Sequence, residues 1–171
     1  MEFYLPLNQV DEVDFNQAIN RFYPQQQRQY QFGALNGMLK GFIDLTFEYE
    51  GKYYVADYKS NFLGETSQHY QQDALHQAMQ EHDYHLQGIL YILALHRWLK
   101  SVKPDYCYAQ HVGGAYYLFL RGMNSLENQN GVYFMRPEQA LIESLDSLLS
   151  EGHLNSKGNP EENTEGQMSL W

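Results

Sequence analysis

Two kinds of hydrophobic pattern follow one another along the chain. Between Met38 and Tyr49 hydrophobic and polar residues alternate with a period of two, which is typical of a β-strand whose two faces differ in polarity. A second run of this kind, Lys52–Lys59, follows after Glu50-Gly51, so the two runs predict a β-hairpin. Between Tyr84 and Lys100 the hydrophobic spacing becomes that of an amphipathic helix.

The rest of the chain continues this alternation of strands and helices. Further strands are expected at Glu2–Leu7, Tyr106–Val112, Ala115–Leu120 and Gly131–Phe134. Further helices are expected at Asp14–Phe22, with Asp14 as its N-cap, at Ser67–Glu81 and at Pro137–Leu149. The polar residues 25–31 predict a connecting loop. This order of elements favours an α/β (α+β) fold built on a mixed sheet.

Composition divides the chain into a folded region and a polar tail. The chain has 171 residues, the size of one ordinary domain, and residues 1–150 carry the periodic patterns. Residues 151–166 are rich in Gly, Asn, Glu and Ser and have almost no hydrophobic side chains, which is typical of disorder. The more hydrophobic end, Met168–Trp171, is also expected to be disordered, with docking on the domain or on a partner as the alternative.

Acidic residues outnumber basic ones by 21 to 11, which gives a formal net charge of −10. Such a balance is not typical of a free-standing DNA-binding domain, because these usually present a basic surface. The single cysteine, Cys107, excludes a disulfide within the chain and is expected to be a small buried residue. The longest hydrophobic run, Gly88–Leu95, is too short to span a membrane, and the N-terminus lacks the features of a secretory signal. These observations predict a cytoplasmic protein with no membrane partner.

The hairpin carries the most informative chemistry. If Glu50-Gly51 is a two-residue loop, Asp44 lies directly opposite Asp57, and Lys59 follows on the same face of the sheet. Two carboxylates at this separation repel each other unless a cation compensates. Two carboxylates beside a lysine therefore suit a site for a divalent metal that acidifies water and neutralises a phosphate. The alternative is a solvated sheet face on which Lys59 forms ion pairs with the two acids.

Three segments around these residues resemble a known family. In chain order they are Gly37–Leu45 (GMLKGFIDL), Tyr53–Asn61 (YYVADYKSN) and Gln87–Tyr91 (QGILY). They resemble the three nuclease motifs of the RecB family, the beta subunits of exodeoxyribonuclease V. Two later segments, Leu93–Leu99 and Gly113–Gly122, are similar to that family as well, so the resemblance covers about residues 35 to 137. It implies the restriction-endonuclease-like fold, also called PD-(D/E)XK, with a central mixed sheet flanked by helices.

The resemblance also implies roles for residues of the hairpin. Asp44 and Asp57 would be metal ligands together with the backbone carbonyl of Tyr58, and Lys59 would be the catalytic lysine. The implied metal is Mg²⁺, with Mn²⁺ or Ca²⁺ able to replace it. The implied reaction is metal-dependent hydrolysis of DNA phosphodiester bonds in a helicase–nuclease complex for recombinational double-strand-break repair, with RecC-like and RecD-like subunits as partners.

Gln87 and Tyr91 match the family's Gln-X-X-X-Tyr motif, which lies near the active site and helps to bind DNA. Their spacing of four residues independently places both on one helical face. The alternative for this pair is an ordinary polar edge beside the apolar stripe of the helix.

One departure from the family concerns histidine. The family has a histidine ligand on a helix upstream of the first aspartate, whereas all seven histidines of this chain follow Asp44. The chain is therefore expected to be a C-terminal fragment that lacks this first helix, and on its own to bind metal weakly and to cut DNA poorly or not at all. His69, His76, His82 and His85 are expected to lie on a solvated helix surface, and His96 to be packed or to cap a helix.

Two other functions are left open by the sequence. The first is a catalytically inert docking or DNA-binding module with a remnant nuclease fold, which the missing histidine favours. The second is an unrelated carboxylate-metal phosphoesterase, which would not need Gln87 and Tyr91.

Overall fold

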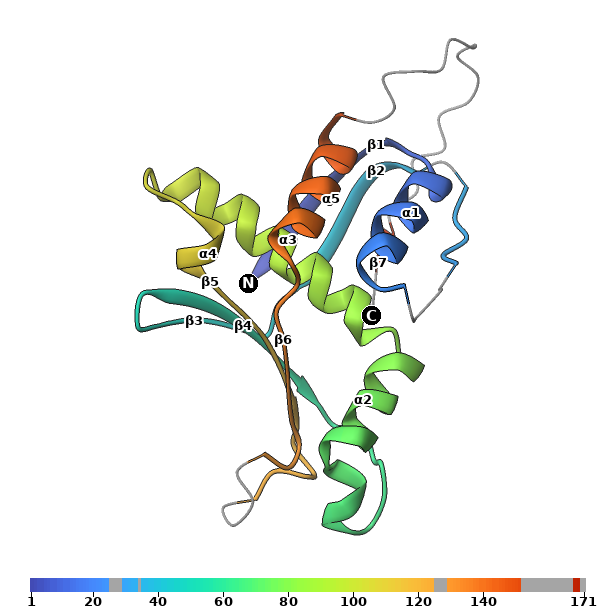
Figure 1. The fold of residues 1–171 in the computed structure, drawn as a ribbon, viewed down its shortest axis with the longest axis vertical. Helices are drawn as coiled ribbons and strands as arrows, with labels where there is room; N and C mark the ends of the chain where they lie inside the picture. Colours follow the sequence, from blue (N-terminus) through green and yellow to red (C-terminus); the bar gives the residue numbers. More distant parts are fainter. Residues whose placement is uncertain (25–28, 34, 125–128, 152–167, 170–171) are drawn as a thin grey trace. The chain divides into compact units, whose positions relative to one another are not determined.

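The structure, a computed structural model, describes residues 1–24, 29–33, 35–124, 129–151, 168 and 169. They form two compact units (Figure 1). The first unit consists of Met1 and Ile43–Pro137, and the second of Glu2–Phe42 and Glu138–Trp171.

The first unit is built on a four-stranded mixed sheet with the order β3-β4-β5-β6. These strands are β3 (Leu45–Tyr49), β4 (Lys52–Lys59), β5 (Val112–Phe119) and β6 (Val132–Met135). β4 pairs antiparallel with β3 and parallel with β5, and β5 pairs antiparallel with β6. A parallel pair needs a crossover connection, and the helical segments between β4 and β5 provide it. The expected mixed sheet flanked by helices is confirmed.

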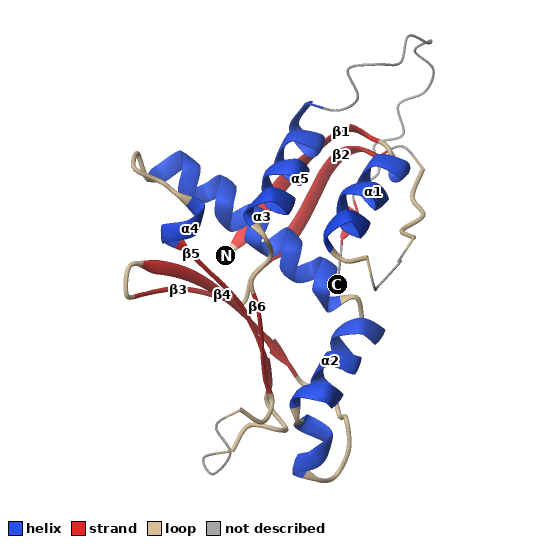
Figure 2. Cartoon of the chain, viewed as in Figure 1, coloured by secondary structure: helices blue, strands red, loops and turns tan. Residues whose placement is uncertain are grey.

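The crossover consists of one 3-10 helix and three α-helices. They are η1 (Ser67–Tyr70), α2 (Gln72–Glu81), α3 (Tyr84–Val102) and the short α4 (Tyr108–His111). The long helix α3 packs on β4 and β5 (Figure 2). Gly88 permits this close approach, because a Cβ atom there would lie 2.5 Å from Sδ of Met135 and 3.2 Å from the Tyr117 hydroxyl. The absence of a side chain at Gly88 thus helps to bring the first turns of α3 close to the sheet.

The alternation of β4 sorts its side chains onto two faces. Val55, Asp57 and Lys59 are buried, and the side chain of Lys59 contacts α3 through Gln87. On the opposite face Tyr54 stacks on Phe47 of β3, with ring centroids 5.2 Å apart. The helix-facing side of β4 therefore holds the charged residues Asp57 and Lys59, while Tyr54 and Phe47 stack on the other side of the sheet.

The second unit combines strands and helices from both ends of the described chain. Its strands are β1 (Glu2–Val10), β2 (Leu35–Phe42) and β7 (Met168–Ser169), in the order β1-β2-β7, and its helices are α1 (Glu12–Phe22) and α5 (Gln139–Glu151). β1 and β2 are antiparallel, β2 and β7 are parallel, and α5 packs on β1 and α1.

The structure corrects the prediction of one continuous strand from Met38 to Tyr49. This segment forms two strands in different sheets, since β2 pairs with β1 and β3 pairs with β4. The change of partner occurs at Ile43 and Asp44, between the two strands. Alternation fixes the face on which a side chain lies but not the strand that pairs with it, so the pattern could not indicate this change.

Three boundaries also differ from the prediction. Asp11, not Asp14, is the N-cap of α1, because its side chain accepts a hydrogen bond of 2.7 Å from the backbone nitrogen of Val13. The expected strand at Tyr106–Val112 is wrong, since α4 occupies most of it and β5 begins only at Val112. Gly113-Gly114 lies inside β5 rather than between two strands. Gly114 has a φ of +142°, a backbone conformation that residues with a side chain rarely adopt.

The expected polar tail lies largely outside the described residues. Met168 and Ser169 pair with Leu39 and Lys40, where the sequence favours disorder over docking. The division into residues 1–150 and 151–171 remains a prediction. None of the helices in the described ranges has the length and hydrophobicity that crossing a membrane requires.

Candidate active site

A buried ion pair lies on the helix-facing side of β4. Asp57 and Lys59 stand two positions apart on this strand, and Nζ of Lys59 lies 2.8 Å from Oδ2 of Asp57. Asp57 is 6% exposed and Lys59 is 9% exposed. Because burying a charge is costly unless it is paired and hydrogen-bonded, each of these groups needs the other.

The ion pair is part of a closed ring of four side chains. Nζ of Lys59 donates to Oε1 of Gln87 at 3.0 Å, and Nε2 of Gln87 donates to the hydroxyl of Tyr91 at 2.9 Å. The Tyr91 hydroxyl donates in turn to Oδ1 of Asp57 at 3.3 Å. α3 supplies Gln87 and Tyr91 from one helical face, as their spacing predicts. The ring gives partners to both carboxylate oxygens of Asp57 and fixes the position of the Lys59 ammonium group.

Gln87 and Tyr91 are the two least exposed residues of the four-membered ring. Gln87 is 2% exposed and Tyr91 is 3% exposed. The alternative of an ordinary polar edge on the helix surface therefore does not describe them. Contact of these two residues with DNA stays a prediction.

Asp44 approaches the ring from the junction between β2 and β3. Its Oδ2 accepts a hydrogen bond of 2.9 Å from the backbone nitrogen of Tyr58. The predicted hairpin register is confirmed, since Tyr49 pairs with Lys52 and Leu45 pairs with Ala56. The ladder ends at that last pair, so Asp44 does not form the expected cross-strand pair with Asp57 and reaches β4 through its side chain instead.

The environment raises the pKa of two members of the ring. Burial raises the pKa of Asp57, the ion pair with Lys59 acts in the opposite direction, and the negative charge of Asp44 raises it further. Burial and the charge of Asp57 also raise the pKa of Tyr91. Tyr91 therefore keeps its proton and serves as a hydrogen-bond donor, while a cation near Asp57 would favour the charged carboxylate.

Two aromatic rings enclose the Lys59 ammonium group. Nζ of Lys59 lies 3.6 Å from the ring centroid of Tyr84 and 5.4 Å from that of Tyr117. These two rings stack with their centroids 5.8 Å apart, and the hydroxyl of Tyr117 donates to the backbone oxygen of Tyr84 at 2.9 Å. Sequence reasoning missed both tyrosines. Tyr117 pairs with Asp57 in the parallel ladder of β4 and β5. This pairing would have indicated Tyr117, but it can be deduced only when the register of the two strands is known.

The oxygen atoms of this site fit a divalent metal. Asp44 and Asp57 supply carboxylates, and Mg²⁺ prefers such hard oxygen ligands. In the described part of the chain no group of three or more His, Cys, Asp or Glu side chains is arranged to hold a metal ion. A metal here would therefore have two carboxylate ligands from this region and would need backbone, water or phosphate oxygens as well.

In the described ranges no histidine joins Asp44 and Asp57 in a group that could hold a metal ion. His69, His76 and His82 are exposed, as expected, but the expectation is wrong for His85, which is buried at 7% exposure beside the rings of His76 and Tyr133. His96 is buried, and its Nδ1 lies 2.7 Å from the hydroxyl of Tyr106. The prediction that His96 is packed is therefore confirmed.

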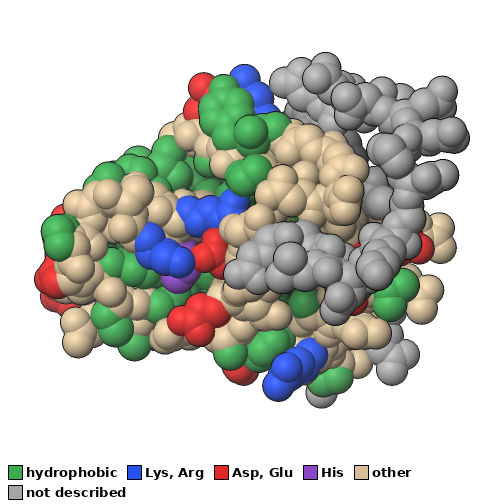
Figure 3. All heavy atoms as spheres, turned by 90° about the horizontal axis from the view of Figure 1, so that it is seen from above, with side chains coloured by type: hydrophobic (Ala, Val, Ile, Leu, Met, Phe, Trp, Pro, Cys, Tyr) green, Lys and Arg blue, Asp and Glu red, His purple; other side chains and the backbone are tan. Residues whose placement is uncertain are grey.

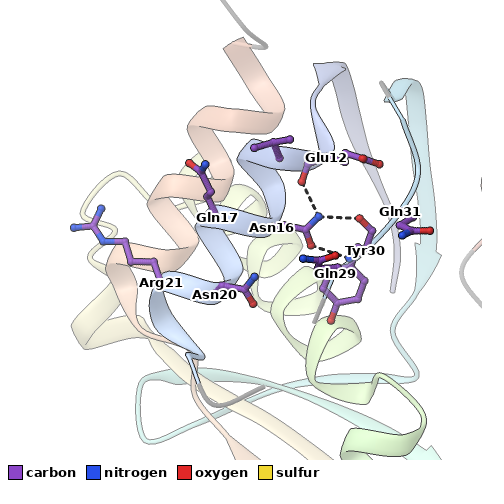
Figure 4. Close-up of a pocket in the computed structure, with 9 residues that line it drawn as sticks. Glu12, Asn16, Gln17, Asn20, Arg21, Gln29, Tyr30 and Gln31 are labelled. Carbon is purple, nitrogen blue, oxygen red and sulfur yellow. Dashed lines mark hydrogen bonds between the residues drawn. The ribbon is translucent and has the colours of Figure 1, made fainter. Parts of the chain in front are cut away.

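A cavity lies in the other unit, beside α1. It has a volume of about 590 Å³, and its lining includes several amide side chains (Figure 4). Asn16 points from α1 toward Tyr30, donating to the Tyr30 oxygen and accepting from the Tyr30 nitrogen, both at 2.8 Å. These amide contacts hold the chain's own backbone, so they explain the local fold rather than a binding site.

Basic side chains are sparse on the face of the molecule shown in Figure 3. There the Lys and Arg side chains occur in small separate groups, and acidic side chains lie among them. This face agrees with the acidic net charge and lacks the broad basic surface that is typical of free-standing DNA-binding domains.

Comparison with known proteins identifies the family. The family model of the PD-(D/E)XK nuclease superfamily matches residues 8–165. The chain belongs to this superfamily. Its nucleases depend on divalent metal ions, in agreement with the carboxylates of Asp44 and Asp57 in this site.

Several similar proteins are RecB subunits of the RecBCD enzyme. The chain is 46% identical to that of Haemophilus influenzae over 150 residues, which cover 87% of this chain and 12% of the relative. It is 46% identical to that of Escherichia coli over 153 residues, covering 88% of this chain and 13% of the relative. The RecB subunit of Mycobacterium tuberculosis is 41% identical over 129 residues, covering 71% and 12%. The chain thus spans about an eighth of the length of these relatives.

Proposed function

We propose that this chain is a RecB-like nuclease domain that hydrolyses phosphodiester bonds of DNA with the help of Mg²⁺. The closed ring of Asp57, Lys59, Gln87 and Tyr91 is the observation that carries the proposal. A purely structural ion pair on a sheet could equally lie at the surface, whereas this one is buried next to a further carboxylate. Asp44, Asp57 and the backbone carbonyl of Tyr58 are the proposed ligands, and Mn²⁺ or Ca²⁺ could occupy the same site.

The residues of the chain have distinct tasks in this reaction. When bound, the metal supplies a more acidic water and neutralises charge on the phosphate. Lys59 provides a cationic donor that can orient the attacking water or stabilise the negative charge of the transition state. Gln87 holds the ammonium group of Lys59 by its amide oxygen, and Tyr91 holds Asp57 by its hydroxyl.

The proposed partners, location and biological role of the domain are based on its similarity to RecB subunits. The RecB subunits similar to this chain are named as parts of the RecBCD enzyme, and we propose DNA and RecC-like and RecD-like subunits as partners of this domain. A cytoplasmic location and a role in recombinational double-strand-break repair belong to the same proposal. The acidic net charge of −10 supports a domain held near DNA by other parts of such an assembly.

The inert docking module is the second candidate, and metal binding separates it from the nuclease. Calorimetric titration of the chain with Mn²⁺ is expected to show saturable binding that the Asp44→Asn variant loses, because a carboxylate is a much better ligand than an amide. Asp105→Asn is a matched control, since the side chain of Asp105 is 76% exposed and pairs only with Lys103 in the described residues. Absence of saturable binding in the unmodified chain would support the inert module.

The role of Tyr91 can be tested separately. Tyr91→Phe removes the hydroxyl that joins Gln87 to Asp57 and keeps the ring. We expect the cleavage rate at saturating DNA to fall about tenfold, the equivalent of one hydrogen bond, while DNA affinity in Ca²⁺ changes little. A loss of affinity with an unchanged maximal rate would instead support direct DNA binding by this residue, as the resemblance implies.

A further inference from the structure

The ring of Tyr84 lies against the ammonium group of Lys59. Nζ of Lys59 lies 3.6 Å from the centroid of the Tyr84 ring, and a cation over an aromatic face is attracted by the electron density of the ring. The ion pair and the hydrogen bond to Gln87 hold Lys59 from other directions. The ring therefore supplies a third restraint, one that involves no hydrogen bond to a carboxylate.

The ring of Tyr84 is itself fixed on several sides. Tyr117 stacks on it at 5.8 Å with an interplanar angle of 18°, and His82 stacks on it at 5.2 Å with an angle of 22°. The Tyr84 hydroxyl donates to Oδ1 of Asn61 at 3.3 Å. These contacts come from β4's following loop, from β5 and from the residues before α3, so the ring position does not depend on one neighbour.

Such a restraint has a specific use at a metal site. A metal ion held by Asp57 would draw on the same carboxylate oxygens that accept from Lys59 and Tyr91. Such an ion would weaken the salt bridge where the ammonium group of Lys59 is needed next to the phosphate. An aromatic ring cannot bind a hard cation as a ligand, so its hold on Lys59 does not compete with the metal.

We propose that Tyr84 is a positioning residue for Lys59 in the nuclease reaction, holding the ammonium group by its ring face. The proposal rests on the nuclease function proposed above. It concerns how Lys59 is oriented and assigns Tyr84 no contact with DNA or with the reacting atoms.

Two variants separate the ring from the hydroxyl. Tyr84→Leu removes the ring, whereas Tyr84→Phe keeps the ring and removes only the hydrogen bond to Asn61. Tyr53→Leu is a matched control, because the ring of Tyr53 on β4 also joins the sheet to α3, through Trp98 at a centroid distance of 5.9 Å, and has no contact with Lys59 among the described interactions. Thermal unfolding of the three variants checks that each is folded.

The first measurement is an NMR signal and needs no activity. In ¹H–¹³C spectra of the chain, the Hε signals of Lys59, assigned by their loss in Lys59→Arg, are expected upfield of the other lysine signals because of the Tyr84 ring current. They should move to the ordinary lysine position in Tyr84→Leu and stay upfield in Tyr84→Phe and Tyr53→Leu. Hε signals of Lys59 at the ordinary position in the unmodified chain would overturn the proposal.

The second measurement is cleavage of DNA under saturating Mg²⁺. We expect Tyr84→Leu to lower kcat about tenfold or more, as for other losses of positioning, with KM and the calorimetric affinity for Mn²⁺ unchanged, and Tyr84→Phe to stay within about twofold of the unmodified chain. An unchanged kcat in Tyr84→Leu, an equal loss in Tyr84→Phe, or an effect confined to KM or to metal affinity overturns the proposal. If the unmodified chain binds no metal and cuts no DNA, the nuclease function fails, and the NMR signal alone decides whether Tyr84 holds Lys59.

Discussion

Replacing Asp57 with asparagine is expected to abolish metal-dependent DNA cleavage, with a loss of about 10³-fold or more. The variant keeps the size of the side chain but loses the negative charge that pairs with Lys59 and that, in the proposed site, would bind the divalent cation. The buried position of Asp57, at 6% exposure, means that few other groups can take over this task. The measurement is the initial rate of degradation of linear DNA across a range of Mg²⁺ concentrations.

The control for this experiment is again Asp105→Asn, which removes one acidic charge at an exposed position. This control should keep the rate of the unmodified chain. Asp57→Asn should stay inactive even at high Mg²⁺. The proposed site has only the carboxylates of Asp44 and Asp57, so a higher metal concentration should not replace the lost carboxylate. Comparable rates for Asp57→Asn and the unmodified chain would exclude Asp57 as a metal ligand for cleavage.

The sequence predicted the hairpin well because two local rules determine it. The two-residue loop at Glu50-Gly51 sets the register, and alternation sets the faces, so the pairs from Leu45–Ala56 to Tyr49–Lys52 follow from the sequence alone. The same rules do not indicate where a strand leaves its sheet. Asp44 lies one residue beyond the β3–β4 ladder, so its position could not be predicted from the sequence pattern.

The surroundings of Lys59 were not predictable for a different reason. Asp57 pairs with Tyr117 across the parallel β4–β5 ladder, and the two strands are separated by a long helical crossover whose length does not determine the register. That ladder also shifts between Tyr53 and Tyr54. Tyr84 and Tyr117 thus meet Lys59 only through tertiary packing of α3 on the sheet.

The resemblance to the nuclease motifs and the geometry explain different aspects of Gln87 and Tyr91. The motif gives the residue types and their spacing, which places both on one helical face. Only the packed structure shows that both are almost fully buried and that their polar groups point at Lys59 and Asp57. A polar pair on an amphipathic helix can otherwise lie at the surface, so its burial could not be deduced from the spacing.

The second large effect concerns stability and its dependence on pH. Lys59→Met is expected to lower the free energy of unfolding by about 3 kcal/mol at neutral pH in the presence of EDTA, because it leaves the buried Asp57 carboxylate without its cation. Tyr91 alone would then remain as a partner of Asp57 from the four-membered ring. Urea unfolding followed by circular dichroism at several pH values measures the effect.

The pH dependence has a definite sign. The pKa of Asp57 is raised in the folded chain, mainly by burial and against the effect of Lys59. The folded state therefore holds this proton to higher pH than the unfolded state, and ionisation of Asp57 costs stability as pH rises above the ordinary carboxyl range. Removing Lys59 raises the pKa further. The deficit of Lys59→Met relative to the unmodified chain should thus grow toward neutral pH and shrink as the pH falls toward the ordinary carboxyl pKa.

A double variant tests whether the charge of Asp57 is the cause. Asp57→Asn combined with Lys59→Met removes both charges, and replacing both members of a buried pair is often nearly neutral. We expect the double variant to recover most of the stability lost in Lys59→Met and to show little dependence on pH in the carboxyl range. A double variant as unstable as Lys59→Met would mean that the lysine stem contributes mainly by packing against Tyr84 and Tyr117. The ion pair would then be a consequence of that packing, and the charge of Lys59 would be retained for the chemistry of the site rather than for its stability.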